Sequence, residues 1–250
     1  LSTLTVNILN KMEQAFLEHG KPDRVLVHGD TSTAFVVALS SFYHEVDVSH
    51  IEAGLRTFDI KTPFPEEANR QLVKVITDSH FSPTELPKQN LIKEGVCSTK
   101  IFVTGNTVID ALLWMQKELV DKPELAGEMV PFVSDLTAQY PRYILVTGHR
   151  RESHGEGFDH ICKALEHIAL RYPDVAIVYP VHLNPKVSGP VNDKLGHLPN
   201  VKLIAPQEYA PFVYLMDNAY FIMTDSGGVQ EEGPSLDKPV LVMRDVTERQ

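Results

Sequence analysis

Thr224-Asp-Ser-Gly-Gly-Val-Gln-Glu-Glu-Gly233 is the stretch that decides how the rest of the chain is organised. It follows an apolar run at 219–223 that has the composition of a buried strand. A strand that ends in Asp-Ser-Gly-Gly and opens into a helix places backbone amides at the positive end of the helix dipole. We expect the hydroxyl of Ser226 to cap this helix, and Gly227 and Gly228 to let a phosphate approach the amides. The stretch therefore predicts a diphosphate site.

Glu232 supports a nucleotide rather than a simple anion. It lies six residues after Ser226, near the same end of the expected helix. Its two acceptor oxygens suit a sugar diol, as the acidic residue of a dinucleotide fold suits a ribose. Local sequence alone is equally compatible with a capped turn followed by surface acids. The rest of the chain has to decide between these interpretations.

Outward from this stretch, the chain alternates short apolar strands with helices. Short strands without polar alternation, in a βαβα rhythm, favour parallel sheets covered on both faces. Strands are expected at 24–28, 46–51, 79–82, 101–104, 143–146, 175–179, 201–204, 220–223 and 240–242. Helices are expected near the start of the chain, at 31–43, 66–76 and 85–94, from 107 onward, and over the apolar stripe at 158–169.

The alternation breaks up between Val120 and Pro141, where prolines and a glycine interrupt it. We place a domain boundary there. The sequence thus predicts an α/β protein of two Rossmann-like domains facing each other across a cleft, with residues 1–125 in the first and 126–250 in the second. The chain opens at Leu1 without a methionine and stops soon after its last expected strand, so we expect it to be truncated at both ends.

Composition limits the classes of function. A chain of 250 residues with 43% hydrophobic content can bury one large core or two smaller ones. A formal charge of −10 argues against general nucleic-acid binding, which needs a basic face. Cys97 and Cys162 stand far apart and indicate neither a disulfide framework nor a zinc site. Without an apolar run of membrane-spanning length or a signal peptide, we expect a cytoplasmic protein with no membrane partner.

Polar residues that follow the strands are the candidate site residues, because open α/β sheets bind ligands beyond the carboxyl ends of their strands. In the first half, these residues are the carboxylates Asp30, Glu52 and Glu66. In the second half they are His149 and the turn at Ser226. This division predicts that one domain holds a nucleotide diphosphate and that the other acts on the attached group.

Each carboxylate also has a purely structural explanation. Asp30 is well placed to cap a helix that begins near Ser32, as aspartate often does. Glu52 is close enough in sequence to Arg56 for an ion pair. Glu66 and Glu67 follow Pro65 and carry charges that are favourable at a helix N-terminus.

The remaining histidines do not indicate a metal site. His154, His160 and His167 lack metal-ligand spacing, and no HExxH or EF-hand pattern occurs. His149 and Arg150 are compatible with a solvated basic turn. The lysine-bearing P-loop and the GxGxxG fingerprint are also absent from the sequence, which argues against an ATPase and a dinucleotide oxidoreductase. We therefore expect no metal and no cofactor.

The chain also carries a series of motifs in a fixed order. They are His28-Gly-Asp-Thr31, His50-Ile-Glu-Ala-Gly-Leu-Arg-Thr57, Pro63-Phe-Pro-Glu-Glu-Ala-Asn-Arg70, Thr104-Gly-Asn-Thr-Val-Ile-Asp110, Thr147-Gly-His-Arg-Arg-Glu152, Tyr179-Pro-Val-His-Leu-Asn-Pro185, Pro206-Gln-Glu-Tyr209, Asp225-Ser-Gly-Gly-Val-Gln-Glu-Glu232 and Met243-Arg-Asp-Val-Thr-Glu-Arg249. In this order and spacing, the motifs closely resemble those of the bacterial non-hydrolysing UDP-N-acetylglucosamine 2-epimerases. Each motif alone is weak, but the complete series is specific and covers essentially the whole chain.

The resemblance implies a GT-B-like fold and the reversible conversion of UDP-N-acetylglucosamine to UDP-N-acetylmannosamine, without metal or nicotinamide. The implied route is elimination of UDP followed by its re-addition. The resemblance also implies a homodimer and a role in the biosynthesis of cell-surface polysaccharides. The family's first strand and loop, which carry an arginine and a lysine that help to hold the nucleotide, have no counterpart in this sequence. Its C-terminal helices have none either.

Position by position, the resemblance implies two groups of site residues. The catalytic group is Asp30, Glu52, Glu66 and His149, of which His149 lies near the diphosphate. The UDP-binding group is Gln207, Phe212, Ser226, Gly227, Gly228, Glu232 and Arg249, with Phe212 near the uracil and Glu232 on the ribose. These residues leave open which carboxylate acts in each direction.

Two other functions fit parts of the same sequence. A GT-B glycosyltransferase would share the fold and the diphosphate turn, but would not need Glu52 and Glu66 as a pair for proton transfer. A non-catalytic UDP-sugar-binding fragment would bind UDP without exchanging the proton on carbon 2 of the sugar. Proton exchange therefore separates the three interpretations.

Overall fold

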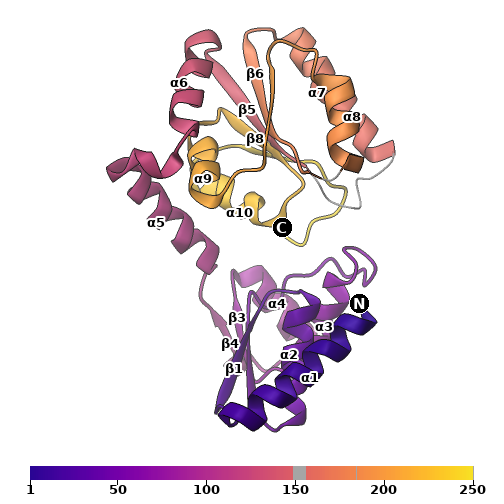
Figure 1. Cartoon of the computed structure of the whole chain (residues 1–250). Helices are drawn as coiled ribbons and strands as arrows, with labels where there is room; N and C mark the ends of the chain where they lie inside the picture. Colours follow the sequence, from indigo (N-terminus) through magenta and orange to yellow (C-terminus); the bar gives the residue numbers. More distant parts are fainter. Residues whose placement is uncertain (149–155, 184, 250) are drawn as a thin grey trace. The chain divides into compact units, whose positions relative to one another are not determined.

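Parallel strands form two separate sheets in the computed structural model, which describes residues 1–148, 156–183 and 185–249 (Figure 1). One compact unit, unit 1, comprises Leu1–Asn106 and Val246–Gln250, and the other, unit 2, comprises Thr107–Asp245. Each unit has its own sheet and its own buried apolar clusters. The expected fold class, two parallel-sheet α/β domains, is confirmed.

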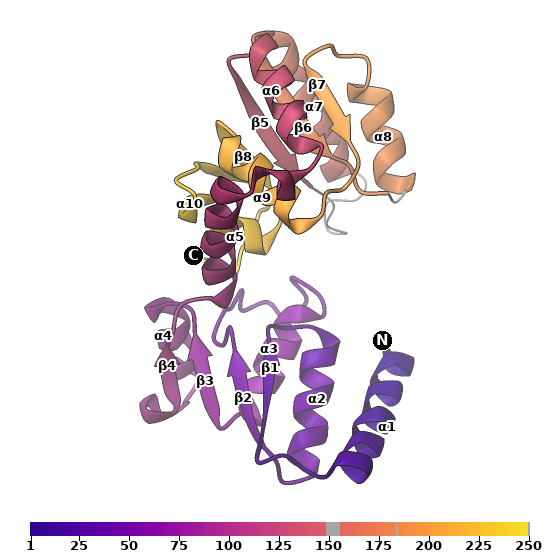
Figure 2. The same ribbon diagram turned by 60° about the vertical axis from the view of Figure 1, so that its left-hand side comes forward.

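Unit 1 contains a four-stranded sheet in the order β1-β2-β3-β4, and Figure 2 shows these strands side by side. All neighbouring pairs are parallel, with Val27 opposite His50 and His50 opposite His80. The strands are β1 (Arg24–His28), β2 (Asp47–Ile51), β3 (Ser79–Ser82) and β4 (Ile101–Val103). The helices are α1 (Ser2–His19), α2 (Ser32–Tyr43), α3 (Glu66–Val75) and α4 (Glu85–Lys93), with a 3₁₀ turn, η1, at Ser98–Lys100.

Unit 2 contains a five-stranded parallel sheet in the order β7-β6-β5-β8-β9. Its strands are β5 (Arg142–Thr147), β6 (Val175–Pro180), β7 (Val201–Ile204), β8 (Phe221–Thr224) and β9 (Val240–Val242). Its helices are α5 (Thr107–Asp121), α6 (Met129–Gln139), α7 (Glu156–Arg171), α8 (Pro185–Leu195), α9 (Tyr209–Asn218) and α10 (Gly227–Ser235), with a 3₁₀ turn, η2, at Pro123–Ala126.

The central strand of unit 2 is buried on both faces. Leu145 of β5 belongs to a cluster with Val213 of α9, whereas Val146 belongs to a second cluster with Leu165 of α7. Figure 1 shows α7 and α8 on one side of this sheet and α9 and α10 on the other. Burial on both faces explains why the sequence of β5 is a continuous apolar run rather than an alternating one. Among the residues that the structure describes, no helix combines the length and apolarity needed to cross a membrane.

The division between the units differs from the boundary expected near residue 125. Helix α5 packs against α9 and α10, so it belongs to unit 2, and the division falls at Asn106 and Thr107. The interrupted segment at 120–141 is also not a linker. It contains η2 and α6, and α6 buries Met129, Val133 and Leu136 in the core of unit 2. Tertiary packing thus decides the structure where the local pattern is interrupted by prolines.

Gly54 is the position in unit 1 where a side chain has least room. Its φ is +92°, and a Cβ there would stand 2.3 Å from the carbonyl oxygen of Pro87 and 3.1 Å from Leu91. We expect Gly54→Ala to lower the free energy of unfolding by about 3 kcal/mol, through both left-handed strain and steric overlap. Gly20→Ala is the matched control, because Gly20 has a φ of +81° and open space around it. Both variants can be measured by urea unfolding. Equal losses in the free energy of unfolding for Gly54→Ala and Gly20→Ala would show that the steric overlap at Gly54 is relieved without cost.

Candidate functional site

The strand–helix turn of unit 2 has the geometry expected of an anion site. Helix α10 begins at Gly227 with Ser226 as its N-cap residue, directly after β8. The backbone amide of Ser226 donates to Oγ1 of Thr224 at 3.0 Å, and that hydroxyl also bonds Oγ1 of Thr147 at 2.5 Å. These bonds fix the turn between neighbouring strands β5 and β8. The first-turn amides of α10 then lie at the positive end of a defined helix.

One expectation for this turn is wrong. The side chain of Ser226 makes no capping hydrogen bond, although the residue occupies the N-cap position with φ −77° and ψ 132°. Thr224 performs the ordering role instead, since its hydroxyl accepts the amide of Ser226. The extended backbone of an N-cap residue is therefore present here without the side-chain bond that usually accompanies it.

Glu232 lies back over the start of α10, as its spacing predicts. Its Oε2 is 3.5 Å from the position of a Cβ built on Gly228, and its side chain is buried. The carboxylate of Glu232 thus lies close to Gly228. The arrangement places an acceptor beside the glycine amides, within one short helix.

A cavity of about 220 Å³ lies at the carboxyl ends of the strands in unit 2, where its lining combines polar groups with an aromatic ring. The lining contains Gln207 and Phe212, two of the expected nucleotide residues, so the structure brings these together. Tyr179 supports the wall by donating its hydroxyl to the carbonyl of Gly148 at 2.6 Å. The cavity is lined by Thr147, Gly148, Pro180, His182, Pro206, Gln207 and Phe212.

The other five lining residues, Thr147, Gly148, Pro180, His182 and Pro206, were not predicted as site residues. Thr147 ends β5 and His182 follows β6, so both stand in segments that the strand-end pattern indicates, but neither was assigned a role from the sequence. His149, which was predicted, lies outside the described residues together with the rest of 149–155.

In unit 1, Asp30 is held by helix α3. The guanidinium Nη1 of Arg70 binds its carboxylate, and Nδ2 of Asn69 donates to its backbone carbonyl at 2.8 Å. The alternative that Asp30 caps α2 is wrong, because Thr31 is the N-cap and its Oγ1 accepts the amide of Ala34 at 3.1 Å. Asp30 is therefore fixed through both its backbone and its side chain, on the side of the carboxyl end of β1.

Arg70 is a buried charge that a second carboxylate balances. Only 1% of its surface is exposed, and its Nη2 lies 3.2 Å from Oε2 of Glu67, which is 0% exposed. Glu67 also accepts the backbone amides of Thr57 at 3.0 Å and Phe58 at 3.2 Å. The sequence assigned no site role to Arg70 or Glu67, although Glu67 was expected as a favourable charge at this helix N-terminus. Glu66, the expected catalytic residue beside them, is half-buried in the first turn of α3.

Glu52 has a strained backbone and well-defined partners. Its φ is +67°, which is unusual for a residue with a side chain and is typical of functional sites. Its Oε1 accepts from Nη2 of Arg249 at 2.7 Å and from Nδ2 of Asn106 at 3.1 Å. Its Oε2 lies 3.3 Å from the position of a Cβ built on Gly29, the residue before Asp30. The structure thus brings two of the expected catalytic segments together.

The proposed ion pair of Glu52 with Arg56 is wrong. Arg56 instead makes a bidentate pair with Glu94, with Nε to Oε1 at 2.8 Å and Nη2 to Oε2 at 2.9 Å. Arg249, expected at the nucleotide, binds Glu52 and also donates from Nη1 to Oε1 of Glu248 at 2.6 Å. Its segment belongs to the same compact unit as Glu52.

Two buried histidines in the sheet of unit 1 make its stability sensitive to acid. Burial lowers the pKa of both His50 and His80 from 6.5 to about 4. Because the folded pKa is depressed, their stabilising contribution is complete above pH 6.5 and is lost as the pH falls toward 4. Between pH 7 and pH 5 we expect a loss of about 2 kcal/mol per histidine in the free energy of unfolding.

Urea unfolding at the two pH values checks this prediction. The double variant His50→Gln/His80→Gln should lose much of the dependence, whereas His19→Gln should retain it, since the His19 side chain is 79% exposed. The same pH dependence in the wild-type protein and the double variant would contradict the prediction.

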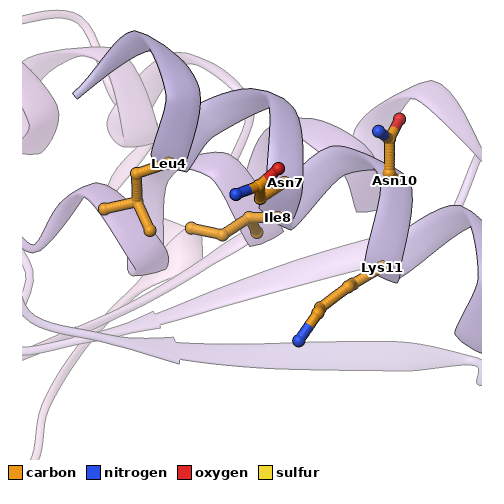
Figure 3. A pocket seen from close by; sticks show the side chains of 5 residues that line it. All are labelled: Leu4, Asn7, Ile8, Asn10 and Lys11. Carbon is orange, nitrogen blue, oxygen red and sulfur yellow. The ribbon is translucent and has the colours of Figure 1, made fainter.

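Unit 1 has a further cavity, of about 430 Å³, along the outer helix α1 (Figure 3). It is lined by Leu4, Asn7, Ile8, Asn10 and Lys11. Leu4, Ile8 and Lys11 have the spacing of one helix face. None of the residues of α1 is buried, and none of the predicted site residues lines this cavity. This cavity therefore lies apart from the predicted site residues that the structure describes.

Comparison with known proteins gives matches over the whole chain. The family model described as UDP-N-acetylglucosamine 2-epimerase matches residues 1–250. The UDP-N-acetylglucosamine 2-epimerase of Escherichia coli K12 is 54% identical over 255 residues, which is 100% of this chain and 66% of that protein. The Campylobacter jejuni protein of the same name is 51% identical and is covered over 65% of its length. The chain thus spans about two thirds of these curated relatives.

Solved structures agree with the sequence matches. The Neisseria meningitidis UDP-GlcNAc 2-epimerase bound to UDP-GlcNAc is 48% identical with a TM-score of 0.88, over 98% of this chain and 65% of that one. The structure of S. aureus MnaA with UDP is 44% identical with a TM-score of 0.90, over 99% of this chain and 65% of that one. The chain belongs to the UDP-N-acetylglucosamine 2-epimerase family.

Proposed function

We propose that this protein interconverts UDP-N-acetylglucosamine and UDP-N-acetylmannosamine by elimination and re-addition of UDP. The observation that carries the proposal is the close approach of the Glu52 carboxylate to Gly29, the residue before Asp30, at neighbouring strand ends in a chain of this family. The relatives' structures contain UDP-GlcNAc or UDP, which supports the choice of substrate.

The chemistry explains why several carboxylates are needed. The proton on carbon 2 is not next to a carbonyl group, so it is weakly acidic, and its removal must be assisted by departure of UDP from carbon 1. A base takes this proton while the bond between carbon 1 and the diphosphate oxygen breaks, which gives a glycal and UDP. UDP then returns to carbon 1 while an acid protonates carbon 2 from the opposite face. A second acid–base group is therefore required.

Asp30, Glu52 and Glu66 are the proposed acid–base groups. Arg70 fixes the carboxylate of Asp30, and Arg249 and Asn106 fix that of Glu52. Such fixed orientation matters because proton transfer requires the acceptor within hydrogen-bond reach of the reacting proton. We propose that Glu52 and Glu66 carry most of the proton transfer.

Unit 2 is proposed to hold the nucleotide. The first-turn amides of α10, with Ser226, Gly227 and Gly228, would stabilise the charge on the departing diphosphate. His149 is proposed to assist there, on the basis of the resemblance alone. Glu232 would accept the ribose hydroxyls, and the cavity with Gln207 and Phe212 would accommodate the uracil.

The proposed reaction needs no cofactor, since only a proton and UDP leave and return and the sugar ends at its initial oxidation level. From the family resemblance we also propose a cytoplasmic homodimer that serves the biosynthesis of cell-surface polysaccharides.

Substrate labelled with ¹⁸O at the oxygen between carbon 1 and the β-phosphorus tests the proposed bond cleavage. We expect the label to scramble into the non-bridging positions of the β-phosphate, because UDP is released and rotates before it returns. The manno epimer should accumulate in the same samples. Epimer without scrambling would contradict elimination. Sugar transfer to an added acceptor, or UDP binding with neither change, would indicate a glycosyltransferase or a binding module respectively.

A further inference from the structure

His50 is a buried histidine whose ring forms a hydrogen bond with the backbone of Gly29, the residue before Asp30. It belongs to β2, only 1% of its surface is exposed, and its Nε2 lies 2.8 Å from the carbonyl oxygen of Gly29. Glu52 follows two residues later in the chain. The inference that follows rests on the proposed function, because it concerns the geometry of the same carboxylates.

Gly29 is held by β2 at both of its backbone polar groups. Its amide donates to the carbonyl of Ile51 at 3.0 Å, and its carbonyl receives the hydrogen bond of His50. Its φ of +72° lies in the left-handed region that favours glycine. The two bonds therefore fix the orientation of one peptide turn against the end of the neighbouring strand.

The position of this turn affects both carboxylates. Oε2 of Glu52 lies 3.3 Å from where a Cβ of Gly29 would stand, and Asp30 is the next residue after Gly29. If Gly29 shifted toward Glu52, the carboxylate would have to move, and Asp30 would move with the turn. The distance between the two carboxylates thus depends on the Gly29 peptide.

The hydrogen bond also defines the chemical state of His50. A carbonyl oxygen can only accept, so Nε2 must carry the proton and donate it. Burial lowers the pKa of His50 to about 4, and the nearby His80, Arg56 and His28 disfavour a further positive charge. The ring is therefore a neutral donor over the range in which carboxylates perform acid–base chemistry, and it does not itself exchange protons with substrate.

We propose that His50 is a positioning residue, whose Nε2–H holds the Gly29 turn and thereby sets the relative placement of Glu52 and Asp30. His80 provides a contrast within the same sheet. It is equally buried and lies opposite His50 on the next strand, but its Nδ1 has no hydrogen-bond partner among the residues that the structure describes. If packing were the only role of these histidines, replacing either of them should affect activity equally.

Three variants separate positioning from packing. His50→Leu removes the donor, whereas His50→Gln places an amide N–H near the position of Nε2, and His80→Leu is the matched control. We expect His50→Leu to lower kcat about 100-fold, because misplacement of a reacting group by about 1 Å has effects of that size. KM should change less than about 3-fold, since the proposed nucleotide site lies in unit 2. His50→Gln should recover most of kcat, and His80→Leu should retain it.

Melting temperatures of the three variants show whether any loss of kcat follows from unfolding. Equal losses of kcat in His50→Leu and His80→Leu, or no recovery in His50→Gln, would overturn the proposal. Loss of activity by a rise in KM alone would also overturn it, because the carboxylates would then be correctly placed.

Nitrogen NMR of the wild-type protein tests the inference without any turnover. The His50 ring should show a protonated Nε2 and an unprotonated Nδ1 at pH 7. The Nδ1–H tautomer, or a charged ring, would overturn the positioning role even in an active enzyme. An inactive protein with the Nε2–H tautomer would instead contradict the proposed function and leave the Gly29 contact established.

Discussion

Replacing Glu52 by glutamine is expected to slow epimerisation about 100- to 10,000-fold, the range that general acid–base groups contribute. Glutamine keeps the size of the side chain and a carbonyl oxygen that can accept from Arg249, but it cannot take up a proton. The affinity for UDP should change little, because glutamine can still hold Arg249, and the other residues expected at the nucleotide belong to unit 2. Initial rates of epimer formation, together with calorimetric titration of UDP, measure the two effects separately.

Glu94→Gln is the control for this substitution. Glu94 is also a carboxylate of unit 1 that pairs with an arginine, Arg56, and it is not a predicted site residue. We expect its substitution to lower stability and to leave turnover nearly unchanged in the folded protein. Near-normal turnover of Glu52→Gln would contradict the acid–base role of Glu52.

Replacing Arg70 by methionine is expected to lower the free energy of unfolding by about 3–5 kcal/mol, the cost of breaking a buried ion pair. The substitution would leave Glu67 without its buried counter-charge and would release the carboxylate of Asp30. Methionine fills much of the space, so the loss should come mainly from electrostatics. Urea unfolding measures it.

Two further variants define the cause of that loss. Glu67→Gln/Arg70→Met should recover part of the stability, since the buried carboxylate is neutralised, but should not recover epimerisation, because Asp30 still lacks its guanidinium. Arg24→Met breaks the exposed pair with Asp47 and should cost less than about 1 kcal/mol. A similar loss for Arg24→Met and Arg70→Met would show that burial of the pair is irrelevant.

The strands were predictable because their signal is local. The expected ranges at 24–28, 79–82, 201–204 and 240–242 coincide with β1, β3, β7 and β9. Strands β5 and β6, which are buried on both faces, are short, continuous apolar runs, and turn residues mark the ends of the expected strands. The apolar stripe at 158–169 likewise lies within α7.

Helices α6, α8 and α9 were missed because their sequences contain helix-breaking residues, which include Pro211 in the first turn of α9. Pro131 lies in the first turn of α6, where the missing amide is tolerated, and Pro190 lies inside α8. Burial of apolar side chains in the core of unit 2 compensates for their poor intrinsic propensity. The predicted domain boundary near residue 125 differs from the observed division for a related reason. No local sequence pattern shows which of the two sheets α5 will cover.

The strand-end locations of Asp30 and Glu52 were predictable from the sequence, but the partners of their carboxylates were not. Asp30 and Glu52 could be placed at strand ends, because topology brings these ends together. Which arginine binds which carboxylate depends on contacts between segments far apart in sequence. Glu52 therefore paired with Arg249 rather than with the nearby Arg56. The capping hydrogen bond expected of Ser226 is absent for a similar reason, because the position of a residue in a turn does not determine its side-chain rotamer.

Incubation of this protein with UDP-N-acetylglucosamine in heavy water tests the central claim most directly. Proton NMR should show deuterium entering carbon 2 of the sugar, with the deuterated manno epimer appearing alongside, because the removed proton exchanges with solvent before carbon 2 is reprotonated. Clear binding of UDP-N-acetylglucosamine without deuterium at carbon 2 would contradict proton transfer by the carboxylates of unit 1.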